Sequence, residues 1–174
     1  MNWIAPQVTR VRMPPKGDEH TLMAALLDHH RQTLLLKCAG LTPEQLALRS
    51  VEPSSMSLLG LVRHLTEVER AWFRRRFAGE SLDFLYCDME TNPDGDFDDV
   101  DPANAEADFD THSREIELIR AAVAGHSLEE TFYHERLKVE MNLRWVYLHL
   151  IEEYARHNGH ADLLRERIDG ATGE

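Results

Sequence analysis

Apolar residues recur every three or four positions along four long stretches of the chain, and this spacing is typical of one buried face of an α-helix. The four stretches are residues 18–38, 57–77, 101–123 and 142–167. Residues that favour helix ends bound them, with Ser57 as a capping residue and Gly40 and Gly125 as stop signals. The pattern therefore predicts an all-α protein with four long helices.

The same spacing predicts which side chains face the core. They are Leu22, Leu26, Thr33 and Leu36 in the first helix, Leu61, Leu65, Val68 and Trp72 in the second, Phe109, His112, Ile116, Ile119 and Val123 in the third, and Leu143, Tyr147, Leu150, Tyr154, His157, Ala161, Leu164 and Ile168 in the fourth. Helices of this kind favour a four-helix bundle, an architecture that builds metal sites from facing helices.

The connecting segments complete the predicted organisation. Thr42 as a cap and Pro43 at the first helical position predict a short extra helix through Leu48. Prolines interrupt the first 18 residues, so we expect an extended N-terminal arm over 1–18 and a single domain over 19–174. Residues 127–140 alternate only in part, and this fits either an extended segment or an irregular connection.

A run of aspartates lies between the second and third helices. Asp94, Asp96 and Asp98 alternate as they do in a helix-loop-helix calcium site. Two later positions break that pattern, because Asp99 stands where glycine is needed and Ala105 where the final glutamate is needed. We therefore interpret the run as a solvated acidic loop.

Charge and cysteine content narrow the class of partner. The net charge of −12 would repel phosphate backbones and anionic lipid head groups, so we expect neither a nucleic acid nor a membrane as partner. Cys38 and Cys87 are far apart and form no paired motif, which argues against a disulfide framework and a thiolate zinc site. With no signal-peptide pattern and no run of membrane-spanning length, we expect a cytoplasmic protein.

Polar residues of metal-ligating type interrupt the fourth helix. Glu153, His157 and His160 fall on one face, and His64 lies beside the apolar stripe of the second helix. Imidazole and carboxylate groups are the ligands that Zn²⁺ prefers, with Ni²⁺ or another divalent ion as the alternative. Spacing alone leaves open whether these histidines bind a metal or only pack. It also leaves open whether His160 is a ligand, a general base or a hydrogen-bond donor to one of the ligands. We interpret His149 as a surface or packing residue, since it points away from His157.

Three segments resemble the DinB-like superfamily, especially an actinobacterial branch of small proteins. They are LVRHLTEVERAWF at 61–73, RWVYLHLIEEYARHNGHADLLRE at 144–166 and AGLTPEQL at 39–46. The resemblance implies an up-down-down-up four-helix bundle with a divalent metal held by His64, Glu153 and His157. A glutamate at the first fourth-helix position is similar to the mycothiol-dependent maleylpyruvate isomerases. Relatives often carry glutamine where this chain has His160.

The resemblance also implies an activity. Several relatives are thiol-dependent transferases or isomerases in which the metal lowers the pKa of mycothiol or bacillithiol. The leading expectation is therefore a mycothiol-type S-transferase that acts on small electrophiles, with His160 orienting a ligand or carrying a proton. The alternatives are a non-catalytic metal-binding or stress-response module, a metal hydrolase with Glu67 or His160 as base, and a bundle whose histidines only pack. Family analogy is also compatible with a homodimer.

Overall fold

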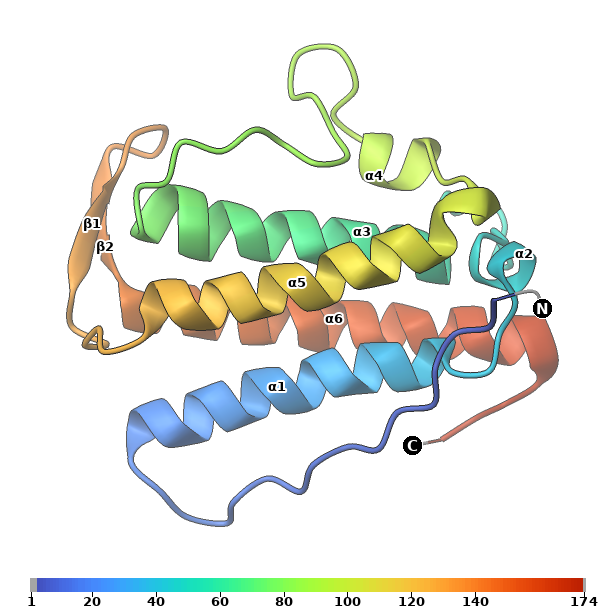
Figure 1. Ribbon diagram of the computed structural model, residues 1–174, viewed down its shortest axis with the longest axis horizontal. Coiled ribbons are helices and arrows are strands. Elements are labelled where there is room, and N and C mark those ends of the chain that lie inside the picture. Colours follow the sequence, from blue (N-terminus) through green and yellow to red (C-terminus); the bar gives the residue numbers. More distant parts are fainter. Residues whose placement is uncertain (1–2, 174) are drawn as a thin grey trace.

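The computed structural model describes residues 3–173 and is mainly helical (Figure 1). In chain order, the elements are α1 (Glu19–Cys38), α2 (Pro43–Leu46), α3 (Leu58–Glu69), the π-helix η1 (Arg70–Phe77), α4 (Gly95–Asp98), the 3-10 turn η2 (Pro102–Asn104), α5 (Ala105–Val123), β1 (Thr131–His134), β2 (Val139–Asn142) and α6 (Leu143–Asp169). The prediction of a mainly helical protein is confirmed. The antiparallel β1–β2 hairpin corrects the all-α prediction, and it shows that residues 127–140 are partly extended.

The helix ends follow the capping residues closely. The side chains of Asp18, Ser57 and Asn142 accept backbone hydrogen bonds of 2.9, 3.0 and 3.0 Å at the starts of α1, α3 and α6. Helix α6 runs to Asp169, two residues beyond the predicted end, because Gly170 there adopts the left-handed conformation with φ of 79°. Helix α3 continues directly into η1, a wider π-type turn that the apolar spacing did not predict.

The four long helices lie side by side, with α1 packed on α6 and α3 packed on both α5 and α6. In Figure 1, α1 and α6 run from left to right, whereas α3 and α5 run the other way. The hairpin closes one end of this group, and α2 and α4 lie at the other end. In the part of the chain that the structure describes, no helix is both long and apolar enough to cross a membrane.

The buried face of α1 differs from the predicted one. Its core side chains include Met23, Leu27 and Leu34, while Leu22 and Leu26 are only partly buried. Thr33 and Leu36 of the predicted face are likewise partly buried. The segment contains two overlapping apolar rows, and the observed row includes Arg31, which has a carboxylate partner inside the protein. Pairing of a charged residue therefore decides how α1 is rotated.

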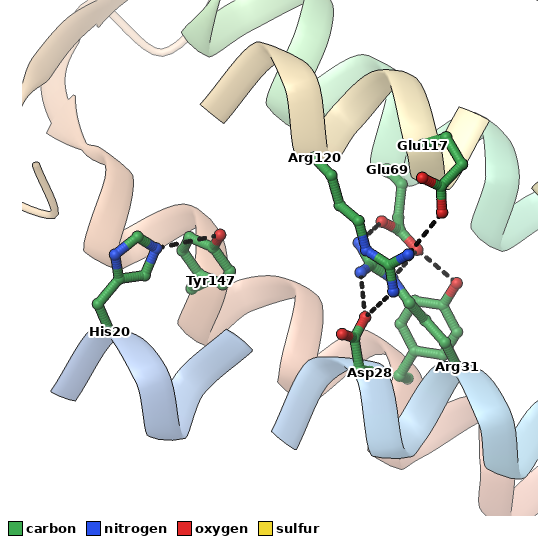
Figure 2. A network of polar contacts seen from close by, with 8 residues as sticks. His20, Asp28, Arg31, Glu69, Glu117, Arg120 and Tyr147 are labelled. Carbon is green, nitrogen blue, oxygen red and sulfur yellow. Dashed lines mark hydrogen bonds and ion pairs between the residues drawn. The ribbon is translucent and has the colours of Figure 1, made fainter. Parts of the chain in front are cut away.

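A buried ion pair joins three of the long helices. The Arg31 guanidinium on α1 donates two hydrogen bonds to the Glu69 carboxylate on α3, one of them 2.9 Å long from Nε to Oε1. The Tyr154 hydroxyl on α6 donates to the same Oε1 at 2.6 Å. Glu69 is 1% exposed. Figure 2 shows how Asp28 extends the network toward solvent, where it pairs with both Arg31 and Arg120.

His112 of α5 is a buried imidazole with a defined tautomer. The Thr66 hydroxyl donates to the Val62 carbonyl at 2.6 Å, so His112 Nδ1 must donate to the Thr66 oxygen 2.9 Å away. The proton-free Nε2 has no hydrogen-bond partner within residues 3–173. Burial lowers the pKa of His112 to about 4, because a charged imidazole would lose its hydration there.

The N-terminal segment follows the surface without helix or strand from residue 3 to residue 17. Backbone hydrogen bonds attach Ala5 to the turn after α1, from Ala5 N to Leu41 O at 3.0 Å and from Gly40 N to Ala5 O at 2.9 Å. The Trp3 ring packs edge-on against Phe109. The division into an arm over 1–18 and a domain over 19–174 stays a prediction, and its residues 1–2 and 174 lie outside the described range.

We expect Glu69→Ala to lower the free energy of unfolding by about 3–5 kcal/mol, because it leaves the Arg31 charge buried without its main partner. Urea denaturation of the purified variant measures this loss. Glu117→Ala is the matched control, since Glu117 pairs with Arg120 while 70% exposed and should cost no more than about 1 kcal/mol. Equal losses in the two variants would contradict a dominant role of the buried pair.

We expect His112 to make the protein less stable in acid. The pKa of His112 is about 4 in the folded chain, against an ordinary value of 6.5, so the unfolded state takes up this proton first as the pH falls. The associated stability is complete above pH 6.5 and is lost between there and pH 4, with a total on the order of 3 kcal/mol. Urea denaturation across this range should show a loss that is about 3 kcal/mol smaller in His112→Gln than in wild type or in His126→Gln. The loss that remains in His112→Gln comes from other groups such as His157, whose pKa is also lowered to about 4.

Candidate metal centre

Helices α3 and α6 bring the three predicted metal ligands together. One ligand atom from each of His64, Glu153 and His157 lies within 4.8 Å of the others. His64 comes from α3, and the other two lie one turn apart on α6. All three side chains are partly buried, so they can hold an ion while leaving access to it.

Hydrogen bonds identify the nitrogen atoms that remain free for an ion. His64 Nδ1 lies 2.7 Å from Asp96 Oδ2, and His157 Nδ1 lies 3.3 Å from His160 Nδ1. The Nε2 atom of each imidazole is therefore the one left to bind a cation. His157 Nε2 lies 3.5 Å from Glu153 Oε2, which places a nitrogen and an oxygen ligand next to each other.

These donors fit a divalent ion such as zinc. Zinc binds tetrahedrally about 2.0–2.2 Å from nitrogen and oxygen ligands, so two ligands of one ion lie roughly 3.3–3.6 Å apart. His157 Nε2 and Glu153 Oε2 already have this spacing at 3.5 Å. The cluster as a whole lies within 4.8 Å, so its side chains would draw closer together to bind one ion. Burial, with smaller contributions from His64 and His160, lowers the pKa of His157 to about 4. A neutral imidazole with a free lone pair is the form that binds a metal.

Asp96 is a functional candidate that the sequence interpretation missed. Its carboxylate is only 6% exposed and accepts the Nδ1 proton of His64, whereas Asp94 and Asp98 in the same run are exposed. The interpretation of this run as a solvated loop was therefore wrong for Asp96. A carboxylate behind a metal-binding histidine fixes its tautomer and raises its basicity.

Close packing of α4 on α3 brings Asp96 to His64. A side chain at Gly60 would put its Cβ 2.9 Å from the Phe97 ring, and at Gly95 it would collide with the Tyr86 carbonyl. Phe97 in turn packs against the His64 ring, with centroids 5.0 Å apart. Two glycines thus allow the approach that the His64–Asp96 hydrogen bond needs.

Glu67 and Arg63 form hydrogen bonds to the backbone of the segment between η1 and α4 and of α4 itself. Glu67 Oε2 accepts the backbone N–H groups of Leu85 and Tyr86 at 2.6 and 3.0 Å. Arg63 donates to the Gly95 carbonyl at 2.8 Å. Burial raises the pKa of Glu67, and its Oε1 has no hydrogen-bond partner in the described chain. Glu67, the alternative catalytic base, thus binds the segment that leads into α4, the short helix that carries Asp96.

His160 and His149 flank the cluster on α6. His160 approaches the far nitrogen of His157 and stands outside the three-residue group. His149 packs between Trp72 and Trp145, as a packing residue should, with ring centroids 4.8 and 4.9 Å away. Its Nε2 also lies 3.7 Å from Glu153 Oε1. The four-residue spacing of His149 and Glu153 was the available signal for this contact.

Both cysteine thiols are held in the protonated form. Burial raises the pKa of Cys38 to about 12. Burial, together with the nearby Glu67 and Asp96 carboxylates, raises the pKa of Cys87 to about 11. Because the thiolate is the reactive form, this environment argues against a cysteine nucleophile at neutral pH.

Comparison with known proteins gives one match over most of the chain. The family model described as mycothiol-S-transferase, which belongs to the DinB-like superfamily, matches residues 22–170. No curated protein and no solved structure matches. The matched range contains His64, Glu153 and His157 together with Asp96 and His160.

We expect Asp96→Asn to weaken binding of a divalent metal by about 10–100-fold, because His64 loses the carboxylate that orients it. Titration of metal-free protein with Zn²⁺ against a competing chelator measures the affinity. Asp98→Asn is the matched control on the same short helix, since Asp98 is exposed and pairs with Arg49. Equal affinities for the two variants would remove Asp96 from the centre.

Proposed function

The chain belongs to the mycothiol-S-transferase family, and on this premise we propose that it is a metal-dependent enzyme that joins a low-molecular-weight thiol to a small electrophile. The observation that carries this proposal is the convergence of His64, Glu153 and His157 on one point between α3 and α6. Three protein ligands leave a further coordination position for a substrate, which is the arrangement of catalytic rather than structural zinc sites.

The metal would make the bound thiol more acidic, and the protein would provide the ligands for the metal. His64, Glu153 and His157 would hold a divalent cation, which would lower the pKa of a thiol and so favour the nucleophilic thiolate at neutral pH. Glu153 contributes one negative charge, and the two imidazoles contribute none, so the ligand set leaves a dipositive ion with net positive charge. We propose Zn²⁺ as the ion and a mycothiol-type thiol as the cosubstrate.

His160 is proposed to support His157 rather than to bind the ion. With His157 Nε2 turned to the metal, its Nδ1 carries a proton, and His160 Nδ1 lies 3.3 Å away to accept it. This contact fixes the orientation of the His157 ring. His160 is partly exposed and so can also pass a proton to solvent.

We further propose that α1, α3 with η1, α5 and α6 form the up-down-down-up four-helix bundle of the DinB-like superfamily. The opposite directions of α1 and α6 relative to α3 and α5 support this topology (Figure 1). In that arrangement the first and last helices are neighbours, as the packing of α1 on α6 requires.

We expect His157→Ala to bind Zn²⁺ at least about 100-fold more weakly and to lose conjugation of mycothiol to monochlorobimane, because one of three protein ligands is gone. Metal analysis of the purified protein and the fluorescence of the bimane adduct measure the two effects. His126→Ala is the matched control, since the His126 side chain is 41% exposed and pairs with Glu130 instead.

Equal metal content in His157→Ala and wild type would disprove the proposed coordination. Metal binding without metal-dependent conjugation across several thiols would disprove the enzyme proposal and favour a non-catalytic module. Hydrolytic turnover without any thiol would instead favour the hydrolase, with Glu67 or His160 as base.

A further inference from the structure

A cavity lies away from the candidate metal centre, between η1, the segment after it and the β1–β2 hairpin. Its volume is about 400 Å³, which is enough for a small organic molecule. Three arginines line it, Arg75 and Arg76 from η1 and Arg136 from the turn of the hairpin. We call this the arginine cleft.

Aromatic rings hold two of these arginines without neutralising them. The Arg76 guanidinium lies 4.4 Å from the centre of the Trp72 ring, and that of Arg75 lies 4.0 Å from the centre of the Phe84 ring. Stacking fixes a guanidinium in place while leaving its charge and its N–H donors available. Neither arginine, nor Arg136, has a carboxylate partner among residues 3–173.

The two carboxylates in the cleft have other partners. Glu80 pairs with Arg74 at 2.6 Å, and Glu135 pairs with Lys138 at 3.0 Å. Burial, and then the charges of Arg75 and Arg136, lower the pKa of Arg76. In a chain of net charge −12, three like positive charges that form no ion pair with the described residues mark a place where an anion would be stabilised.

Two side chains, Trp72 and His149, lie between the cleft and the candidate metal centre. The Trp72 ring that carries Arg76 also contacts His149, with centroids 4.8 Å apart. His149 Nε2 in turn lies 3.7 Å from the proposed ligand Glu153. His134 lines the cleft as well, and because its Nδ1 accepts the Leu137 N–H, its Nε2 carries a proton for donation.

We propose that the arginine cleft binds the oxyanion of the electrophile, so that the preferred electrophiles carry a carboxylate, phosphate or sulfonate. This inference rests on the proposed S-transferase activity and names the substrate class. Arg75, Arg76 and Arg136 donate to the anion, and the aromatic pair Trp72 and His149 covers the apolar part of the molecule that extends toward the thiol.

Two electrophiles that differ by one charge test the proposal, 4-chloro-3,5-dinitrobenzoate and neutral 4-chloro-3,5-dinitrobenzamide. In each reaction the thiolate sulfur bonds to the ring carbon, chloride leaves with the bonding pair, and the thiol proton goes to buffer. Reactivity differences cancel when variants are compared with wild type. We expect Arg76→Met and Arg136→Met to lose about tenfold or more in kcat/KM for the benzoate only, through KM for the electrophile.

Arg114→Met is the matched control, because Arg114 is an exposed arginine of α5 outside the cleft and should leave both reactions unchanged. Equal losses on the charged and the neutral electrophile in both cleft variants, or no loss on either, would overturn the proposal. The first result would mean that the arginines act on the thiol or on the fold.

A binding measurement separates failure of the cleft from failure of the activity. Metal-loaded protein is titrated at constant ionic strength with benzoate, phenyl phosphate, benzenesulfonate and neutral benzamide, while NMR follows the tryptophan indole signals. We expect at least one anion, but not benzamide, to shift the Trp72 signal and leave that of Trp3 in place, and the anion that binds best identifies the oxyanion. No anion-specific shift would refute the cleft even if conjugation occurs.

Discussion

The Glu69 carboxylate is the group on which the arrangement of the helices depends. A buried carboxylate costs several kcal/mol unless it is paired, and its partners come from two other helices, Arg31 from α1 and Tyr154 from α6. Satisfying all three side chains fixes how far α3 is shifted along α6. On α3, His64 lies five positions before Glu69. On α6, which runs the opposite way, His157 lies three positions after Tyr154. The register that neutralises Glu69 therefore also brings the two imidazoles together, with ring centroids 4.9 Å apart.

This dependence explains which parts of the fold were visible in the sequence. Helix positions and their capped starts are local properties, so the apolar spacing and residues such as Asp18 and Asn142 predicted them. The rotation of α1 is not local. Two apolar rows compete there, and the choice between them depends on Arg31 meeting Glu69, 38 positions away. A pattern-based prediction favours the row without the charge and therefore selects the wrong face.

The candidate metal centre could likewise be predicted only in part. Glu153 and His157 share one helix, so their four-residue spacing shows that they lie together. No spacing within one helix relates His64 to them. Its place beside the apolar stripe of the second helix suggested it as a third ligand, and the family resemblance then supported that choice. Asp96 could not be found at all from its own surroundings, since it stands in a run of aspartates that are mostly exposed. Its burial comes from the close approach of α4 at Gly60, a property of packing that local composition does not record.

Groups of opposite charge lie in different places along α3, η1 and α6. Toward one end lie Glu153 and Asp96, whose negative charges suit a cation. Toward the other end lie the arginines of the cleft, with Trp72 and His149 between the two regions. An enzyme that joins a thiol to an electrophile must hold two different molecules with their reacting atoms in contact. Under the proposed function, the residues between α3 and α6 would hold the metal and its thiol while the cleft would hold the oxyanion, so separation in space, not in charge, would keep the two substrates apart.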